Sequence, residues 1–153
     1  MRKLPLVAAA LLGFALLMGA VTRSSQALNG PGTIRITSRD IQLSLANQGA
    51  AGRGAGDTLL IRQLLFNKGI RKRSIGHADM VCTYTGYRSR QCNGTYFLPK
   101  GSIVVSGSLR FREFYELAVV GGTNLYDNVH GTMTATMYTR FPHREILIFR
   151  LGV

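Results

Sequence analysis

Apolar and polar residues alternate along short segments of this chain, and this period of two limits its fold more than any other feature. In the clearest segment, residues 102–112, the apolar positions are Ile103, Val105, Leu109 and Phe111, with mostly serine and arginine between them. Side chains of a strand point alternately to opposite faces, so this pattern predicts a strand with one face in a core and one in water. After residue 27 no segment shows the three-to-four-residue spacing of a helix face. The chain is therefore expected to be all-β.

Eight such segments predict the strands of one domain. They are residues 33–45, 57–67, 73–85, 91–98, 102–112, 115–120, 129–139 and 145–151. Most of their connections are short enough for hairpins, which favours antiparallel neighbours. Eight antiparallel strands can close on themselves, and closure removes the exposed edges of a sheet. We predict a single eight-stranded antiparallel closed barrel; a two-sheet sandwich is the alternative.

The first 27 residues have the composition of a cleaved secretory signal peptide. Arg2 and Lys3 precede an uncharged apolar run, and Ser25-Gln26-Ala27 fits the small-x-small cleavage pattern. The alternative is an uncleaved anchor, because the apolar run approaches the length that spans a bilayer. We expect a secreted protein with no transmembrane segment after cleavage. Residues 28–56 then hold the first strand and a flexible Gly-rich loop, and residues 57–153 the rest of the barrel.

The exported part of the chain is strongly basic. Cleavage removes Arg2, Lys3 and Arg23 from the 19 basic residues, which leaves 16 against 7 acidic residues and a net charge of +9. Such a charge suits an anionic partner, including a cell surface. The one dense basic cluster, residues 68–73, has no aromatic side chain to stack on a base, and it falls at a predicted turn. We therefore expect no nucleic-acid partner.

Two cysteines, Cys82 and Cys92, lie in the exported part. Thiols in an oxidising compartment usually pair, and these two flank a turn-like stretch centred on Tyr87. We predict a disulfide across a hairpin. A metal site is the weaker alternative, because two cysteines without histidine at ligand spacing cannot complete a tetrahedral set.

Few motifs in the sequence indicate a particular chemistry. The Gly-rich segment at residues 47–56 lacks the lysine and the following helix of a phosphate-binding loop, so we interpret it as a loop at the barrel rim. The three histidines, His77, His130 and His143, are scattered and predict no metal site.

Asp40 and Asp79 each interrupt a strand that is otherwise apolar or neutral. Pointing inward, they would lose water, their pKa values would rise, and they would suit proton transfer. Pointing outward, they would be ordinary solvated acids.

The segment from Leu117 to Thr136, "LAVVGGTNLYDNVHGTMTAT", resembles a segment of allene oxide cyclases, plant dirigent proteins and their secreted bacterial relatives. Its matching positions are Gly121, Gly122, Thr123, Tyr126 and Gly131. The glycine pair suits a tight turn with positive φ, and Thr123 belongs to the same structural turn. Asn124 replaces the family's last glycine and also accepts a left-handed backbone. Asp127 and His130 replace basic residues of the plant proteins, so a role of those charges does not transfer.

The resemblance implies a ligand cavity inside the barrel, no cofactor, and a homodimer or homotrimer. It implies an apolar or aromatic small-molecule ligand whose cyclisation or stereoselective coupling the barrel directs, by positioning more than by catalytic groups. The candidate catalytic residues are Asp40, Asp79 and His130, and Tyr84 and Tyr96 are expected to wall the pocket. The alternative is a non-catalytic secreted barrel that binds a ligand or is purely structural, held at an anionic cell surface.

Overall fold

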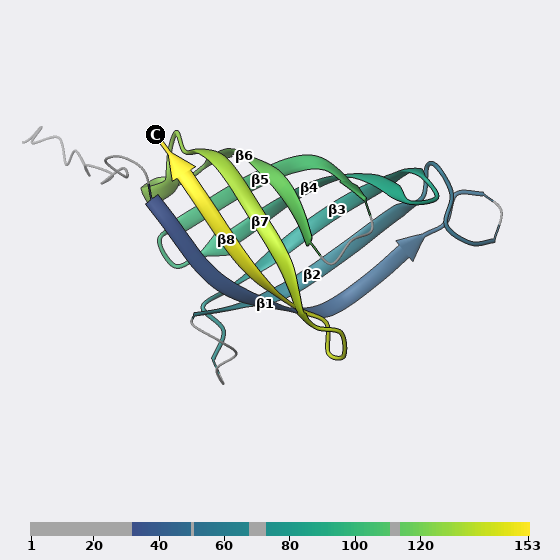
Figure 1. The fold of residues 1–153 in the computed structure, drawn as a ribbon, viewed down its shortest axis with the longest axis horizontal. Helices are drawn as coiled ribbons and strands as arrows, with labels where there is room; N and C mark the ends of the chain where they lie inside the picture. The colour runs from purple at the N-terminus through teal and green to yellow at the C-terminus, as the bar shows by residue number, and fades with distance from the viewer. Residues whose placement is uncertain (1–31, 50, 68–72, 111–113) are drawn as a thin grey trace, which may run out of the picture.

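Eight strands form where the sequence alternates, and together they close into one barrel (Figure 1). The computed structural model describes residues 32–49, 51–67, 73–110 and 114–153. The strands are β1 (Gly32–Ala46), β2 (Thr58–Asn67), β3 (Gly76–Gly86), β4 (Ser89–Leu98), β5 (Gly101–Arg110), β6 (Phe114–Gly122), β7 (His130–Thr139) and β8 (Arg144–Gly152). The predicted signal peptide and residues 68–72 of the basic cluster lie outside the described residues.

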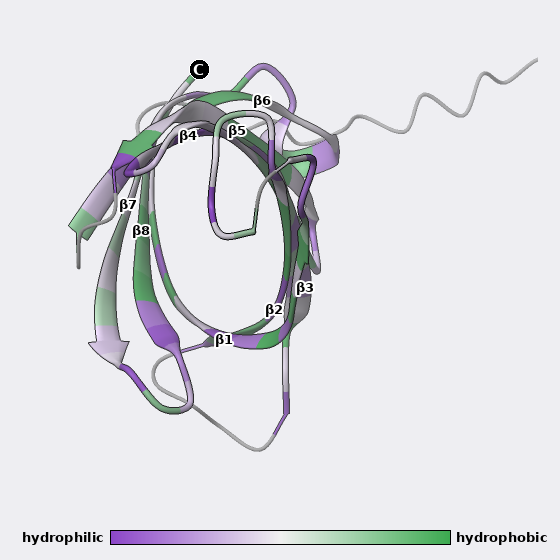
Figure 2. Ribbon diagram, turned by 90° about the vertical axis from the view of Figure 1, so that its right-hand side faces the viewer, coloured by the Kyte–Doolittle hydropathy of each residue, from purple (hydrophilic) through white to green (hydrophobic). Residues whose placement is uncertain are grey.

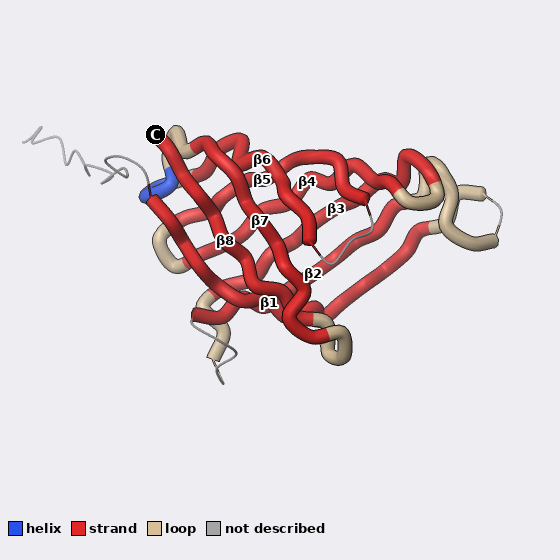
Figure 3. Tube along the Cα trace, viewed as in Figure 1, coloured by secondary structure: helices blue, strands red, loops and turns tan. Residues whose placement is uncertain are grey.

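Each strand pairs antiparallel with the next, and β8 pairs with β1 to close the ring. Figure 2, turned by 90° from Figure 1, shows the strands as a closed oval. The closed barrel is therefore confirmed and the sandwich alternative is wrong. Apart from the 3-10 helix η1 (Asn124–Tyr126), the described elements are all strands, as Figure 3 shows. No described helix has the length and apolar character needed to cross a bilayer.

The first strand is the longest and changes partners along its length. Residues 32–39 pair with β8, whereas residues 36–46 pair with β2. A bulge between Asp40 and Gln42 shifts the register, and bulges re-aim the side chains that follow them. Leu43 and Leu45 consequently line the lumen, although they have odd numbers and the buried Ile36 of the same strand has an even number. Past residue 39 this part of β1 has no β8 partner, which leaves the barrel open beside it.

The apolar positions of the alternating strands fill one half of the lumen. They include Ile103, Val105, Leu117, Val119, Met133, Leu147, Phe149 and Leu151, each at most 3% exposed. Cys82 and Cys92 also face inward, lie opposite each other on β3 and β4, and form the predicted disulfide.

The "GGTN" turn between β6 and β7 has the expected positive φ, at Gly121 with φ 159° and at Asn124. The left-handed backbone falls on Asn124, with φ 56°, as that residue type allows. Gly122 is required because a Cβ there would meet the carbonyl oxygens of Ser102 and Tyr126. Thr123 Oγ1 accepts a 3.0 Å hydrogen bond from the Ser102 amide, which ties the turn to the start of β5.

Candidate functional site

The other half of the lumen is an open cavity of about 550 Å³. Its lining includes Arg53 of the β1–β2 loop and Phe141 and His143 of the β7–β8 turn. Its size falls within the range of small-molecule sites. The apolar lining residues are Leu43, Leu45, Leu59, Ile61, Met80, Leu109, Met137 and Phe141, joined by Tyr84 and Tyr115.

Glu145, the second residue of β8, lines this cavity and is only 5% exposed. The Tyr115 hydroxyl donates to Glu145 Oε2 at 3.0 Å, and Gln63 Nε2 donates to the same oxygen at 3.1 Å. Within the described chain, Glu145 Oε1 has no hydrogen bond. One carboxyl oxygen is therefore held in place, and the other is left for a proton or a ligand.

Asp40 lies beside Glu145 because Gln63 joins them. The same Nε2 atom donates to Asp40 Oδ1 at 2.7 Å, so a single amide nitrogen bridges two carboxyl groups. Asp40 Oδ2 is 3.0 Å from His143 Nδ1, and the Asp40 amide donates to the His143 carbonyl. The turn between β7 and β8 thus places His143 against β1.

The environment separates the proton affinities of these groups. Burial raises the pKa of the Glu145 carboxyl, which favours its protonated form. Burial also raises the pKa of Tyr115 well above its usual value, with the charge of Glu145 adding to the effect. The side-chain hydrogen bond with Asp40 raises the pKa of His143. An acid whose protonated form is favoured therefore lies close to an imidazole that is oriented by an aspartate.

Several buried polar atoms near this cluster lack partners. Gln63 Oε1, Ser38 Oγ and the Tyr96 hydroxyl are buried, and none has a hydrogen-bond partner in the described part of the chain. Ser38 is the register partner of Glu145, and the charge of Glu145 contributes to the raised pKa of Tyr96. Buried polar atoms are normally satisfied, so this layer suits water or a polar ligand group.

The Gly-rich loop is held at the cavity mouth by Asp57. Asp57 Oδ1 accepts from the Gln48 amide at 2.8 Å, and Oδ2 accepts from the Gly54 amide at 2.7 Å. These backbone hydrogen bonds lower the pKa of Asp57. The loop consequently places Arg53 in the cavity lining, in agreement with the expected rim position.

The structure brings together three of the five predicted site residues. Asp40 and Tyr84 line the cavity. Tyr96 is buried in the lumen and packs edge-on against Phe149, with ring centroids 5.1 Å apart.

Asp79 and His130 lie elsewhere, which corrects the expectation of an inward pleat. Met80 and Tyr84 face the lumen, so Asp79 points outward, 41% exposed, and pairs with Arg62 at 2.7 Å. His130 is exposed at the start of β7, whereas the cavity is lined by the end of that strand.

Four central residues were not predicted: Gln63, Tyr115, His143 and Glu145. For three of them, the alternation of inward and outward positions along the strand was the signal that could have found them. Glu145 lies at the same alternate positions of β8 as the buried Leu147 and Phe149. Gln63 and Tyr115 likewise follow the inward positions of β2 and β6. His143 lies in a turn, where alternation gives no information. Among the described residues, no group of three or more His, Cys, Asp or Glu side chains could hold a metal ion.

Comparisons with known proteins place this barrel in a recognised architecture. No protein-family model matches the chain, and no curated protein matches its sequence. Among solved structures, it is similar to pyocyanin demethylase, with a TM-score of 0.68 and 19% identity over 79% of this chain and 100% of that one.

Two other kinds of barrel show the same similarity. A pterocarpan synthase dirigent protein gives a TM-score of 0.64 at 12% identity, over 82% of this chain and 86% of that one. The Diels Alderase AbmU from Streptomyces koyangensis gives 0.63 at 14% identity, over 79% of this chain and 64% of that one. These TM-scores show that the chain has the same barrel fold as a dirigent protein, and at these identities they show the fold alone.

Proposed function

We propose that this protein is a secreted barrel that binds an apolar or aromatic small molecule in its open cavity and directs the cyclisation of that molecule. One observation carries the proposal: Gln63 Nε2 bridges Asp40 and Glu145 at the base of a cavity with largely apolar walls. A cavity used only for storage needs no convergent acids. The disulfide Cys82–Cys92 supports export, since such bonds persist in oxidising compartments.

The proposed reaction is an isomerisation. Glu145, whose protonated form burial favours, gives a proton from Oε1 to one atom of the bound molecule as the ring bond forms. His143 takes a proton from another atom at Nε2, because Nδ1 is occupied by Asp40. The molecule keeps its mass, and the open mouth lets solvent restore both protons. No oxidant or reductant takes part.

Positioning of the bound molecule supplies the rest of the proposed rate acceleration. The apolar walls exclude water around the ligand and hold it in one folded conformation, which lowers the entropy lost on reaching the transition state. Similarity to a dirigent protein and a Diels Alderase supports this assignment, because the names of those proteins describe guided bond formation.

Binding is tested with N-phenyl-1-naphthylamine, a neutral aromatic probe that fluoresces in apolar sites. The wild-type protein is expected to bind it, and Ile61→Phe, which fills the cavity, is expected to abolish binding. Leu60→Phe is the matched control, since Leu60 precedes Ile61 on β2 and points outward, 45% exposed. Equal binding by both variants would contradict a lumenal site.

Chemistry is tested with a small-molecule extract of the host, analysed by chromatography and mass spectrometry. The wild-type protein should convert one component into an isomer of equal mass, and Glu145→Gln should not. Retained probe binding by Glu145→Gln shows that its cavity is intact. Conversion by both proteins, or by neither, would overturn the catalytic assignment.

A further inference from the structure

Large apolar side chains are exposed beside the opening of the cavity. They are Phe141, in the turn after β7, and Ile41, Leu43 and Leu45, on the second half of β1, and each is between 43% and 89% exposed. Three of the four, Leu43, Leu45 and Phe141, also line the cavity. We call these four residues the apolar rim.

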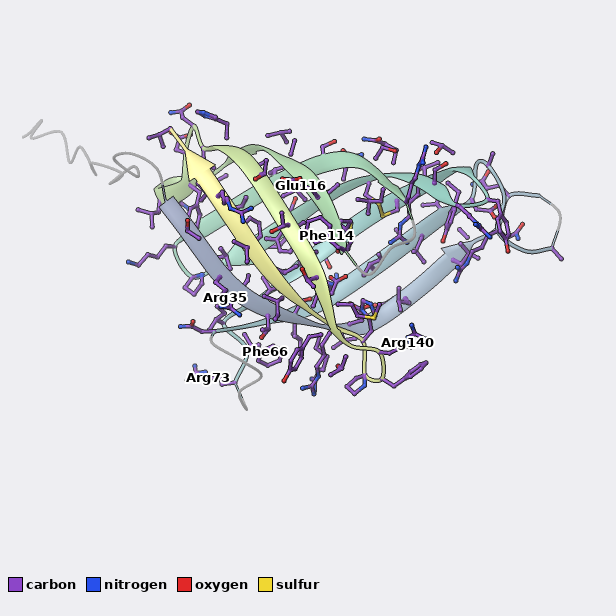
Figure 4. The ribbon with its side chains drawn as sticks, viewed as in Figure 1. Arg35, Phe66, Arg73, Phe114, Glu116 and Arg140 are labelled. Atoms are coloured by element: carbon purple, nitrogen blue, oxygen red, sulfur yellow. A yellow bond between two sulfur atoms is a disulfide. The ribbon has the colours of Figure 1, made fainter. Side chains whose placement is uncertain are left out.

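The rim is carried by a projecting turn and by a strand that is paired on one side. The Asp40 amide donates to the His143 carbonyl at 3.1 Å, which holds the turn after β7 against β1. Figure 4 marks this turn by the label of Arg140, the residue before Phe141, and shows the turn projecting beyond the strands. The register of β1 with β8 ends at residue 39, so the two leucines of the rim are open to solvent although they face the lumen.

Such a group of exposed apolar side chains indicates a contact surface. Monomeric proteins rarely expose large apolar side chains together, and the patches that they do expose mark sites of interaction with a partner or a membrane. Phe141 stands at the tip of its turn, 89% exposed, so it can enter a bilayer while the barrel behind it stays in water. The area of apolar surface buried in this way adds to the strength of membrane binding.

The charge around the rim is complementary to an anionic bilayer. Arg110 is exposed and lines the same cavity, and Arg88 is exposed in the turn after β3, beside Gly52 of the loop that follows β1. The two acids of the cavity are turned inward, since the side chain of Asp40 is 10% exposed and Glu145 is buried. After residue 27 the chain has 16 basic residues against 7 acidic ones, a net charge of +9. Anionic headgroups attract a protein with this charge.

We infer that the apolar rim is a membrane-docking surface, which buries Phe141 and the exposed leucines of β1 in the outer layer of an anionic lipid bilayer. Apolar insertion and attraction to the headgroups act together at such a surface. Docking turns the opening of the cavity toward the bilayer, so an apolar molecule can pass between lipid and cavity without crossing water. Only this transfer rests on the proposed function; the docking stands without it.

Insertion of the rim is tested with a fluorescent reporter. The chain has no tryptophan, so Phe141→Trp introduces a single indole. On mixing with vesicles of phosphatidylcholine and phosphatidylglycerol, we expect its emission to shift to shorter wavelength and to be quenched by lipids brominated near the headgroup. Phe97→Trp is the matched control, because Phe97 is also exposed but lies near the end of β4, whereas the cavity is lined by the start of that strand. Its emission should not change.

Co-sedimentation with the same vesicles measures the affinity. Phe141→Ser should weaken binding about tenfold, because burial of one phenylalanine side chain is lost, and Phe97→Ser should leave binding unchanged. Vesicles of phosphatidylcholine alone should bind about tenfold more weakly than the anionic vesicles, and added salt should remove this difference.

The outcomes separate this inference from the proposed function. If Phe141→Trp responds to vesicles no more than Phe97→Trp does, the inference is wrong. If its emission shifts with rising protein concentration in the absence of vesicles, the rim contacts a second copy of the chain, and the inference also fails. Equal binding to neutral and anionic vesicles would overturn the anionic assignment. A protein that binds N-phenyl-1-naphthylamine in its cavity but does not bind vesicles keeps the proposed function and loses the docking surface, and the opposite result does the reverse.

Discussion

Replacing Gln63 with leucine tests the network at the base of the cavity. The change removes a 2.7 Å hydrogen bond to Asp40 and a 3.1 Å hydrogen bond to Glu145. Each is worth about 2 kcal/mol when the carboxyl is ionised and about 1 kcal/mol when it is neutral. Leucine also removes the unpartnered Gln63 Oε1, which returns about 2 kcal/mol.

The net effect depends on pH. In alkaline buffer Glu145 tends toward its ionised form, and we expect Gln63→Leu to lower the free energy of unfolding by about 2 kcal/mol. In acid buffer, below the raised pKa of Glu145, this carboxyl is protonated, and the loss should shrink to about 1 kcal/mol. The physical reason is that the lost Gln63 donor favours the ionised form of Glu145, so its removal costs more as Glu145 ionises.

Urea denaturation at the two pH values measures this difference. Gln91→Leu provides the control, because Gln91 is an exposed glutamine of β4 and its replacement should change stability by no more than about 0.5 kcal/mol. A loss below about 0.5 kcal/mol at both pH values, or an equal loss at both, would refute the bridging role of Gln63.

Three further predictions concern the site and its supports. Because burial raises the pKa of Glu145, the stabilisation from its proton is complete below the usual value of 4.5 and is lost as the pH rises through the raised pKa. Glu145→Gln should remove this loss, so the Tm difference between acid and alkaline buffer should become smaller. An unchanged Tm difference would contradict the prediction. Replacing Cys82 and Cys92 with alanine frees a loop of sequence separation 10 and should cost about 2.7 kcal/mol in urea denaturation; a loss below about 1 kcal/mol would count against the bridge as a support. Asp57→Asn should speed tryptic cleavage after Arg53, because the loop loses a carboxylate acceptor; cleavage at the wild-type rate, followed by mass spectrometry, would show that Asp57 does not hold the loop.

The sequence located the strands well because alternation is a local property. Seven of the eight predicted strands begin within two residues of the observed ones, and β3 begins three residues later than predicted. The same alternation contained the information that Glu145 and Gln63 face inward, since each shares the parity of buried apolar neighbours. A polar residue at an inward position was therefore a usable signal, whereas Asp40 and Asp79 were chosen only because each is an acid within a neutral strand.

The outward direction of Asp79 also followed from parity, because Met80, Cys82 and Tyr84 occupy the alternate positions of β3. Asp40 was harder to place. The bulge directly after it shifts the register of β1, so the alternation of residues 32–39 does not predict which way the residues beyond the bulge point. The local pattern was reliable only where the register was continuous.

By itself, the sequence determined the all-β class, the eight strands, the hairpin disulfide and the resemblance to a dirigent-like barrel. These features depend on residues close together along the chain. Only the tertiary structure decided which polar groups meet, because closure brings Glu145 of β8 and Asp40 of β1 to the side-chain amide nitrogen of Gln63 on β2. The reason is physical, since strand register and barrel closure fix contacts between distant residues, and no local pattern encodes them.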